Sequence, residues 1–374
     1  MESFQKEEKE ELSTLLRKYA DLLINYCVEA RPGDKILIES TFLAEPLLRE
    51  LWRSGLEAGA ILEFSLDFRD KQRLFYQHAG ESQLSYVPLL KRHAFEAFDG
   101  YIFVRAPYDF DESHKDFPYK CRLRQEAMQP IRRTYFKRTA TRELKRNLCQ
   151  FPTEIAAQRA GMDLPAYREF IFKACKLYDE DPVRSWLEVR RVQQTIVDRL
   201  NAATHIRFVG ERTDISFSTK GRIWINSDGQ TNMPSGEVYT SPVEDSVNGH
   251  IYFKYATDGG EEITDINLEV KDGWITSWNA SSNRAHLDKI FAIDGARRFG
   301  EAAVGTNYDI QQFTKNILFD EKIGGTIHMA VGQSYLQTGG QNQSAVHWDL
   351  IKDMKNGGRI YADGLLIYEN GQFL

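Results

Sequence analysis

The chain contains few cysteines, and their positions argue against cross-linked or zinc-knuckle folds. Its four cysteines stand far apart and include no C-x-x-C pair, so neither a disulfide framework nor a zinc knuckle is predicted. Runs of 18 or more apolar residues are missing, which excludes a membrane-spanning helix, and the N-terminus lacks the apolar core of a signal peptide. We therefore expect a protein of the reducing cytoplasm that has no membrane partner.

Glycine-rich phosphate-binding motifs are missing as well. Helix-like and strand-like segments alternate in the first half of the chain, which predicts an open α/β sheet with parallel strands. No G-x-G-x-x-G or G-x-x-x-x-G-K-[ST] motif follows any of these strands, so we expect a scaffold rather than a nucleotide-binding domain. The predicted elements are a helix over residues 5–30, strands over 35–40, 61–68 and 101–106, a helix over 44–58 and helical segments up to about residue 97.

An excess of positive charge is also missing, since 48 Lys and Arg face 54 Asp and Glu and the net charge is −6. This balance gives the chain no general affinity for nucleic acid. One basic stretch, residues 115–146, interleaves eleven basic side chains with aromatic ones, a combination that can bind a nucleic-acid backbone. We interpret it as a surface helix that balances acidic patches, with a contact to the substrate's C-terminal carboxylate or to a second subunit as the alternative.

The second half of the chain changes, from about residue 206, to short alternating segments separated by glycine turns. The Asp272-Gly273 turn predicts a hairpin between two of them, and helices are predicted near 287–291 and 348–354. Since 374 residues exceed what one core usually organises, we predict two domains. They are an N-terminal open α/β domain with a helical insertion over residues 1–203 and a C-terminal β-rich α+β domain over residues 204–374.

Histidine is scarce too, with eight in the chain, yet two stand close together near the C-terminal end. His347 and Asp349 form an H-x-D pair, and residues two apart on an extended strand point to the same face. His328 lies in an apolar run flanked by glycines, which is typical of a buried strand. These spacings favour a metal site in the C-terminal domain, although a single histidine of this kind is more often a hydrogen-bonded core or surface residue.

Two glutamates upstream could supply further ligands. Glu237 follows Gly236, and Glu301 follows Gly300 in the same way. Because glycine allows a tight bend, a Gly-Glu step can turn a carboxylate inward. Taken alone, each glutamate is more typical of a solvated loop.

Five motifs, which occur in this order within residues 206–374, carry a family resemblance. In order they are MPSGEVYTSPVEDSVNG, GEAAVGTNYDI, FTKNILFDEKIGGTIHMAVGQSY, SAVHWD and GGRIYADG. Together they resemble the aminopeptidase S and aminopeptidase T family of dinuclear metalloaminopeptidases. The resemblance implies a homodimer, and it places the metal ligands at Glu237, Glu301, His328, His347 and Asp349, joined by Tyr335.

The chemistry of these residues predicts two metal ions. Three carboxylates and two imidazoles exceed the needs of one tetrahedral zinc ion and suffice for two divalent ions, such as zinc, cobalt or manganese, if one carboxylate bridges them. Glu237 and Glu301 are both candidates for bridging. Tyr335 either coordinates an ion or donates a hydrogen bond to the oxyanion of the tetrahedral intermediate. Glu244 and Asp245 are candidate general bases, with surface charges or loop caps as the alternative.

The predicted function is a metal-dependent aminopeptidase that releases N-terminal residues from peptides through a hydroxide held between two metal ions. A free α-amine that bound one ion would explain why N-terminal residues are removed. Two alternatives stay open, namely a metal-binding protein without activity and a dinuclear hydrolase that acts on another bond, such as a phosphoester. The expected partners are peptide substrates and a second copy of the chain.

Overall fold

The computed structural model describes residues 2–110, 116–258 and 260–374. The chain divides into two compact units, the first comprising Met1–Val183 and Gly229–Pro234 and the second Arg184–Asp228 and Ser235–Leu374. This division falls in the first turn of the long helix α10 (Pro182–Asn201), whereas the predicted boundary lies just after that helix. None of the described helices is both long and apolar enough to cross a membrane.

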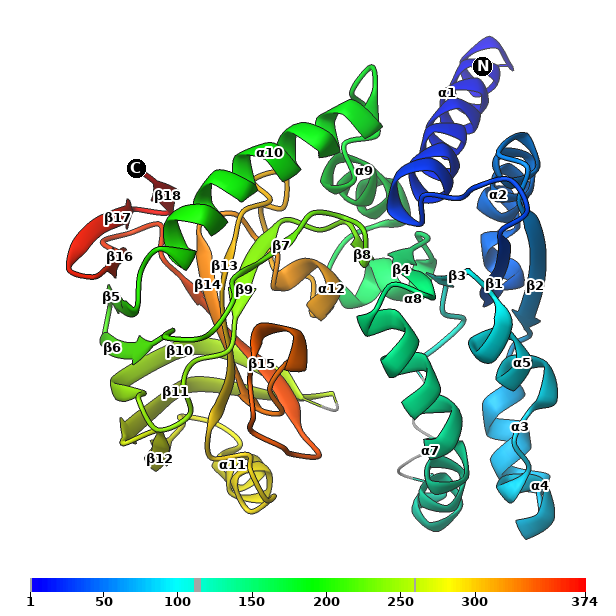
Figure 1. Ribbon diagram of the computed structural model, residues 1–374. Coiled ribbons are helices and arrows are strands. Elements are labelled where there is room, and N and C mark those ends of the chain that lie inside the picture. Colours follow the sequence, from blue (N-terminus) through cyan, green and yellow to red (C-terminus); the bar gives the residue numbers. More distant parts are fainter. Residues whose placement is uncertain (1, 111–115, 259) are drawn as a thin grey trace. The chain divides into compact units, whose positions relative to one another are not determined.

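The first unit is built around a five-stranded sheet (Figure 1). The strands lie in the order β2-β1-β3-β4-β8, and every neighbouring pair is parallel. The predicted parallel α/β sheet is therefore confirmed, with a short strand added from a later part of the chain. The strands are β1 (Lys35–Thr41), β2 (Ile61–Asp67), β3 (Gly100–Arg105), β4 (Lys145–Gln150) and β8 (Asn232–Met233).

Helices make the connections in this unit, because parallel strands require a crossover. The helix predicted over residues 5–30 is α1 (Glu2–Asp21), continued by the π-helical segment η1 (Leu22–Cys27). The other helical elements are η2 (Phe42–Ala44), α2 (Glu45–Glu57), α3 (Lys71–His78), α4 (Glu81–Ser85), α5 (Leu89–Ala97), α7 (Pro118–Ala140), α8 (Glu154–Arg159) and α9 (Leu164–Ala174).

Helix α7 forms most of the basic stretch, while Lys115 lies outside the described residues. Several of its cations bind backbone carbonyls of the same unit. Lys120 donates to the carbonyls of Tyr76 at 2.8 Å and Ala79 at 2.9 Å, and Arg138 donates to that of Phe95 at 2.9 Å. These bonds give part of the positive charge a structural role, in agreement with the surface-helix interpretation.

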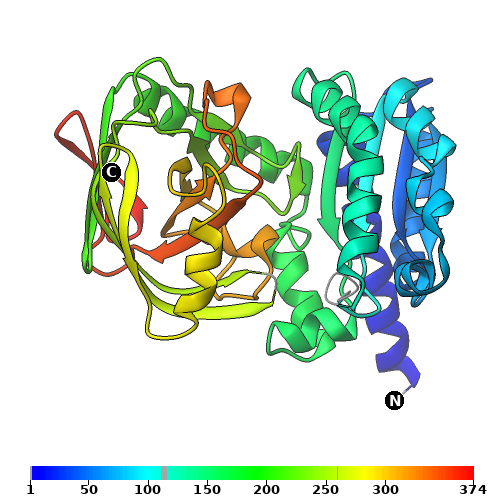
Figure 2. The ribbon, with the colours of Figure 1, turned by 90° about the horizontal axis from the view of Figure 1, so that it is seen from below.

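The second unit packs two antiparallel sheets around a common core (Figure 2). One sheet has the order β12-β11-β10-β6-β5-β16-β17-β18 and the other β15-β14-β13-β9-β7. Asp272 and Gly273, which join β11 to β12, both have positive φ, 49° and 76°, as a tight hairpin turn requires.

The strands of the larger sheet are β5 (His205–Gly210), β6 (Thr213–Ser218), β10 (Asn248–Asp258), β11 (Glu261–Lys271), β12 (Trp274–Asn279), β16 (Arg359–Ala362), β17 (Leu365–Glu369) and β18 (Gln372–Phe373). Those of the smaller sheet are β7 (Ile225–Ser227), β9 (Glu237–Thr240), β13 (Phe299–Gly305), β14 (Thr326–Gly332) and β15 (His347–Asp353). The short helices of this unit are α11 (Arg284–Phe291), α12 (Ile317–Asp320) and η3 (Leu336–Thr338). The predicted β-rich second half is confirmed.

One predicted element of this unit is wrong. A helix was expected near residues 348–354, but the segment is strand β15, paired with β14 along its whole length. Trp348 and Leu350 point into the core, while His347 and Asp349 lie on the other face. Taken locally, the apolar residues of this segment fit the periodicity of a helix as well as that of a strand. Pairing with the buried strand β14 stabilises the strand.

Candidate metal centre

The five-stranded sheet of the second unit has two different faces. In β14 the apolar side chains Ile327, Met329 and Val331 belong to the core between the sheets. Since side chains alternate along a strand, His328 and Ala330 lie on the opposite face. The same alternation applies to the neighbouring strands, and it brings Glu237, Tyr239, Glu301, His328, His347 and Asp349 to this second face.

Strand register places small residues between these polar side chains. Ala303 pairs with Tyr239 on one side and with His328 on the other, and Ala330 pairs with Glu301 and Asp349. Directly opposite residues on one face of a sheet are in contact distance. A methyl group at these two positions leaves space among the larger polar groups.

The predicted Gly-Glu steps have a steric reason. At Gly300 a Cβ atom would lie 2.4 Å from the carbonyl oxygen of Gln333, next to an irregularity in the pairing of β13 with β14. At Gly236, where φ is +113°, a Cβ atom would lie 2.8 Å from Cβ of Asn307. Glycine therefore permits the backbone approach that turns both glutamates inward.

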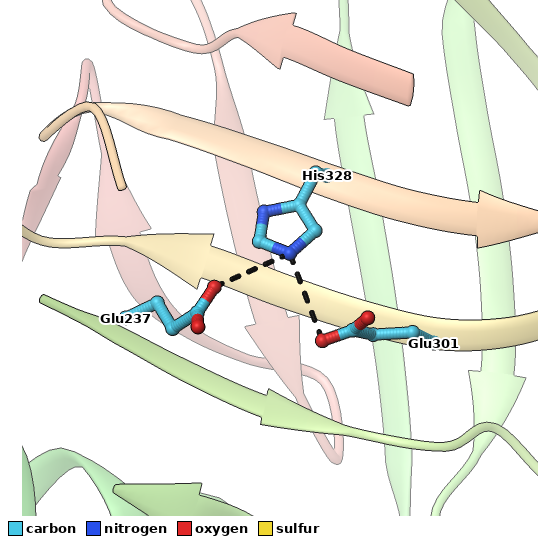
Figure 3. Close-up of side chains that lie close together, drawn as sticks. All are labelled: Glu237, Glu301 and His328. Atoms are coloured by element: carbon cyan, nitrogen blue, oxygen red, sulfur yellow. Dashed lines mark ion pairs between the residues drawn. The ribbon is translucent and has the colours of Figure 1, made fainter. Parts of the chain in front are cut away.

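One group of possible ligands joins Glu237, Glu301 and His328 (Figure 3). His328 Nε2 lies 3.4 Å from Glu237 Oε2 and 3.7 Å from Glu301 Oε1. All three side chains are buried. They come from three adjacent strands, β14, β9 and β13.

A second group shares Glu301 with His347 and Asp349. His347 Nε2 lies 3.1 Å from Glu301 Oε2 and 3.6 Å from Asp349 Oδ1. The other ring nitrogen, Nδ1, lies 2.8 Å from the carbonyl oxygen of Gln333, so Nδ1–H donates to it and Nε2 is left for a ligand bond. The two oxygens of Glu301 thus face two different imidazoles.

Several buried polar atoms of these groups form no hydrogen bond with any described residue. They are Glu237 Oε2, both ring nitrogens of His328 and Asp349 Oδ1. Buried polar atoms usually have partners, and unsatisfied ones call for an explanation such as a bound ion. Carboxylate oxygen and imidazole nitrogen are also the donors that divalent transition metals bind. The residues therefore fit a metal ion.

Electrostatics in the metal-free protein point to the same conclusion. Burial alone would lower the pKa of His328, but the Glu301 and Glu237 carboxylates raise it to about 9. For His347, burial again acts to lower the pKa, and Asp349 and Glu301 raise it well above its usual range. Both imidazoles are consequently in the cationic, doubly protonated form at neutral pH. They supply positive charge where a metal cation would otherwise supply it.

Tyr335, the sixth residue predicted for the site, is close to His347. Its hydroxyl oxygen lies 3.3 Å from His347 Nε2, and the two rings are 4.9 Å apart between centroids. Burial, followed by the Glu301 and Asp349 carboxylates, raises the pKa of Tyr335 well above its usual value. In the metal-free protein the hydroxyl therefore keeps its proton and can act as a hydrogen-bond donor.

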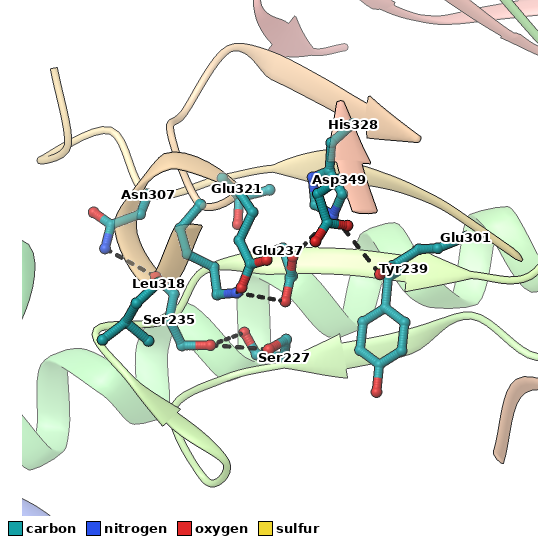
Figure 4. Close-up of polar contacts among 12 residues, drawn as sticks. Ser227, Ser235, Glu237, Tyr239, Glu301, Asn307, Leu318, Glu321, His328 and Asp349 are labelled. Carbon is teal, nitrogen blue, oxygen red and sulfur yellow. Dashed lines mark hydrogen bonds and ion pairs between the residues drawn. The ribbon is translucent and has the colours of Figure 1, made fainter. Parts of the chain in front are cut away.

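Glu321 and Lys322 also belong to this region, and sequence reasoning did not single them out. Glu321 forms a third possible ligand group with His328 and Asp349, and Figure 4 shows its side chain on the same side of the sheet as Glu237. Lys322, which is fully buried, pairs with Glu321 and lies 2.9 Å from Glu237 Oε1. Burial acts to lower the pKa of Lys322, but Glu237 and Glu321 raise it well above its usual value.

Comparisons with known proteins agree with a metal centre. The sequence profile of the thermophilic metalloprotease (M29) family matches residues 12–373. The chain belongs to this family. Aminopeptidase 2 of Geobacillus stearothermophilus is 27% identical over 90% of this chain and 91% of its own length. Aminopeptidase PepS of Streptococcus thermophilus is 27% identical over 96% of this chain and 98% of its own.

The fold is shared with a solved structure. Wild-type AmpT from Thermus thermophilus superposes with a TM-score of 0.81 at 22% identity, covering 96% of this chain and 99% of that one. The predicted family and the predicted class of enzyme, a hydrolase of the metalloprotease type, are confirmed. Membership of the thermophilic metalloprotease family implies a divalent metal, and the three ligand groups offer places for it.

The two candidate general bases, Glu244 and Asp245, belong to none of the three possible ligand groups. Glu244 pairs with the nearly buried Arg222, and its Oε1 accepts hydrogen bonds from the backbone N–H of Gln341 at 2.6 Å and of Asn342 at 3.3 Å. Its carboxylate thus holds the loop that follows Tyr335. Asp245 is exposed. The loop-cap alternative therefore suits Glu244 better than proton transfer does.

Proposed function

We propose that the chain is a metal-dependent aminopeptidase that holds two divalent ions on this face of the sheet and hydrolyses the N-terminal residue of peptides. The observation that carries the proposal is the position of Glu301, whose Oε1 is 3.7 Å from His328 and whose Oε2 is 3.1 Å from His347. A carboxylate placed between two imidazoles suits a bridging ligand. The aminopeptidase names of the relatives support the same activity.

The ligands divide into two sets. Glu237 and His328 would hold one ion, His347 and Asp349 the other, and Glu301 would bridge them. Glu321 adds a carboxylate on the His328 side. Mixed oxygen and nitrogen ligands suit zinc, cobalt or manganese, so we propose these as the working metals. When bound, two such ions supply Lewis acidity and an activated water for hydrolysis of the peptide bond.

The protein's own groups would complete the chemistry. Tyr335 keeps its hydroxyl proton and would donate a hydrogen bond to the oxygen that becomes negative in the transition state. The Gln333 carbonyl fixes the ring orientation of His347. The free α-amine of a substrate would bind one of the ions, which accounts for removal of the N-terminal residue. A homodimer in the cytoplasm completes the proposal; the homodimer rests on the family resemblance and the compartment on the cysteine pattern.

The direction of cleavage tests this activity. Acetylating the N-terminus of a good peptide substrate should lower kcat/KM by about 10- to 100-fold, or roughly 1.4–2.7 kcal/mol, because an amide nitrogen has no available lone pair for an ion. Amidating the C-terminus of the same peptide should have little effect. Mass spectrometry of the products over time provides the measurement. Release of residues from the C-terminal end first, or equal cleavage of acetylated peptides, would contradict an aminopeptidase.

Metal binding should depend steeply on pH. The raised pKa values of His328 and His347 mean that the metal-free protein holds both protons at pH 7, and each must leave before its nitrogen can bind a metal. Affinity for zinc should therefore rise between pH 6 and pH 8, by up to about tenfold per pH unit for each proton released. Calorimetry in buffers of different ionisation enthalpy counts the protons.

His347→Ala is the control for this pH effect. The variant has lost one of the two imidazoles, so the ion that still binds should release about one proton fewer than the pair of ions in the wild type. A zinc affinity that stayed constant from pH 6 to pH 8 would show that the imidazoles do not bind the metal.

A further inference from the structure

Lys322 is a buried charge that the proposed chemistry does not use directly. Its side chain is 0% exposed, and it stands between helix α12 and strand β14. Removing an ammonium group from water is unfavourable unless opposite charges and hydrogen bonds compensate for it. A fully buried lysine in the middle of a ligand cluster therefore needs a specific reason.

Lys322 contacts one carboxylate oxygen of Glu237, and the other oxygen faces His328. Lys322 Nζ lies 2.9 Å from Glu237 Oε1. Glu237 Oε2 lies 3.4 Å from His328 Nε2 and forms no hydrogen bond with any described residue. One oxygen is thus held by the lysine, and the other is directed at the candidate ligand group. Lys322 also pairs with Glu321, the further carboxylate on this side.

The backbone around Lys322 is tied to the segment that carries Glu237. Asn307 N–H donates to the Lys322 carbonyl at 3.0 Å, and the Asn307 side chain donates to the Ser235 carbonyl at 2.9 Å. Figure 4 shows this second bond. Asn307 therefore links the two segments, which fixes the distance between the lysine and the glutamate.

We propose that Lys322 is a positioning residue for the metal centre, which holds Glu237 by one oxygen and Glu321 beside it so that both present ligand atoms to the ion next to His328. This inference rests on the proposed function, because it assumes that an ion binds there. Lys322 also adds a positive charge among four carboxylates, those of Glu237, Glu301, Glu321 and Asp349. The other role that Lys322 could have is a purely structural ion pair.

Lys322→Met tests the proposal, because methionine keeps an unbranched side chain and removes the charge. Stoichiometry and affinity for zinc and manganese should be measured by titrating metal-free protein against a chromophoric chelator. We expect the ion beside His328 to bind about 10- to 100-fold more weakly, the usual effect of removing a residue that orients a ligand. The ion beside His347 should keep its affinity.

Lys352→Met is the matched control. Lys352 is also largely buried, and its Nζ donates to the carbonyls of Glu211 at 2.8 Å and Tyr252 at 3.3 Å. It lies on β15, but its side chain is on the opposite face from His347 and Asp349. Loss of this lysine should leave both metal affinities unchanged, whatever it does to the melting temperature.

A double-mutant comparison keeps the test valid if Lys322→Met does not fold. Glu237→Gln with Lys322→Met removes both members of a buried ion pair, which is tolerated better than removal of one. If Lys322 acts through Glu237 and Glu321, adding Lys322→Met to Glu237→Gln should weaken binding beside His328 by less than about tenfold, because only the contact with Glu321 is then left to lose. A further loss of more than about tenfold in the Glu237→Gln background would overturn the positioning role.

Two other outcomes separate this inference from the proposed function. Wild-type protein that binds two ions, together with Lys322→Met protein that binds them equally well, would overturn the role of Lys322 alone. Wild-type protein that binds no divalent ion would overturn the proposed metal centre, and the role of Lys322 with it.

Discussion

Removal of the metal should abolish peptide hydrolysis, and Glu301→Gln should reproduce this loss even with excess zinc, cobalt or manganese present. Glu301 is buried and directs one oxygen to each imidazole, whereas an amide has no negative charge and only one oxygen. Both ions should therefore bind weakly. Since metal ions contribute several kcal/mol to such reactions, kcat/KM should fall by at least about 10³-fold. Metal content by mass spectrometry and hydrolysis of aminoacyl reporters are the measurements.

Two further variants serve as comparisons for Glu301→Gln. Asp349→Asn should weaken the ion beside His347 and leave the ion beside His328 in place, because Glu237 and Glu301 still hold it. Glu269→Gln makes the same chemical change at an exposed position on β11 and should have no effect. Hydrolysis that continued after verified removal of metal would rule out the dinuclear mechanism, and Glu301→Gln protein with two ions would rule out the bridging role.

Much of the candidate site could be predicted from the sequence because its candidate ligands lie on regular strands. The H-x-D spacing of His347 and Asp349 depends only on the two-residue alternation of a strand. The Gly-Glu steps at Glu237 and Glu301 are local as well, since the steric need for glycine sits next to the glutamate. The sequence left Glu237 and Glu301 as equal candidates for bridging, because the proposed choice of Glu301 depends on the pairing of β13 with β14.

Glu321 and Lys322 were missed for a physical reason. An adjacent Glu-Lys pair beyond a short helix is typical of a solvated surface, and nothing in its spacing indicates burial. The signal available was their position inside a family motif, seven and six residues before His328. Their burial results from the connection that Asn307 makes between separate segments, which is a tertiary effect.

The fold was predicted best where the hydrophobic pattern had a single interpretation. Strands β1, β2 and β3 lie within one or two residues of the predicted ranges, since apolar β-branched runs between turns admit little else. The helix predicted for the segment of β15 was wrong because the apolar residues there fit both the helical and the strand periodicity. The short strand β8, which joins the sheet of the first unit from residues 232–233, has too few residues to produce a pattern.

Tyr335→Phe should lower turnover by about 10²–10³-fold, the usual effect of deleting one oxyanion donor, while both ions stay bound. The pKa of Tyr335 is raised by burial and by the Glu301 and Asp349 carboxylates, so in the metal-free protein its hydroxyl is a proton donor rather than an anionic ligand. Phenylalanine keeps the ring that contacts Tyr239 and His347 at centroid distances of 5.3 and 4.9 Å. The change therefore removes one oxygen without opening a cavity.

Metal occupancy separates the two roles of Tyr335. If the oxygen is a donor, kcat should fall with little change in KM, because the interaction is made in the transition state. If the oxygen is a ligand, the ion beside His347 should bind more weakly, and excess metal should recover part of the activity. His347→Ala is the matched control that loses metal in either case. Full occupancy with unchanged turnover would assign the tyrosine to packing alone, since its contacts with Tyr239 and His347 would then account for its place before η3.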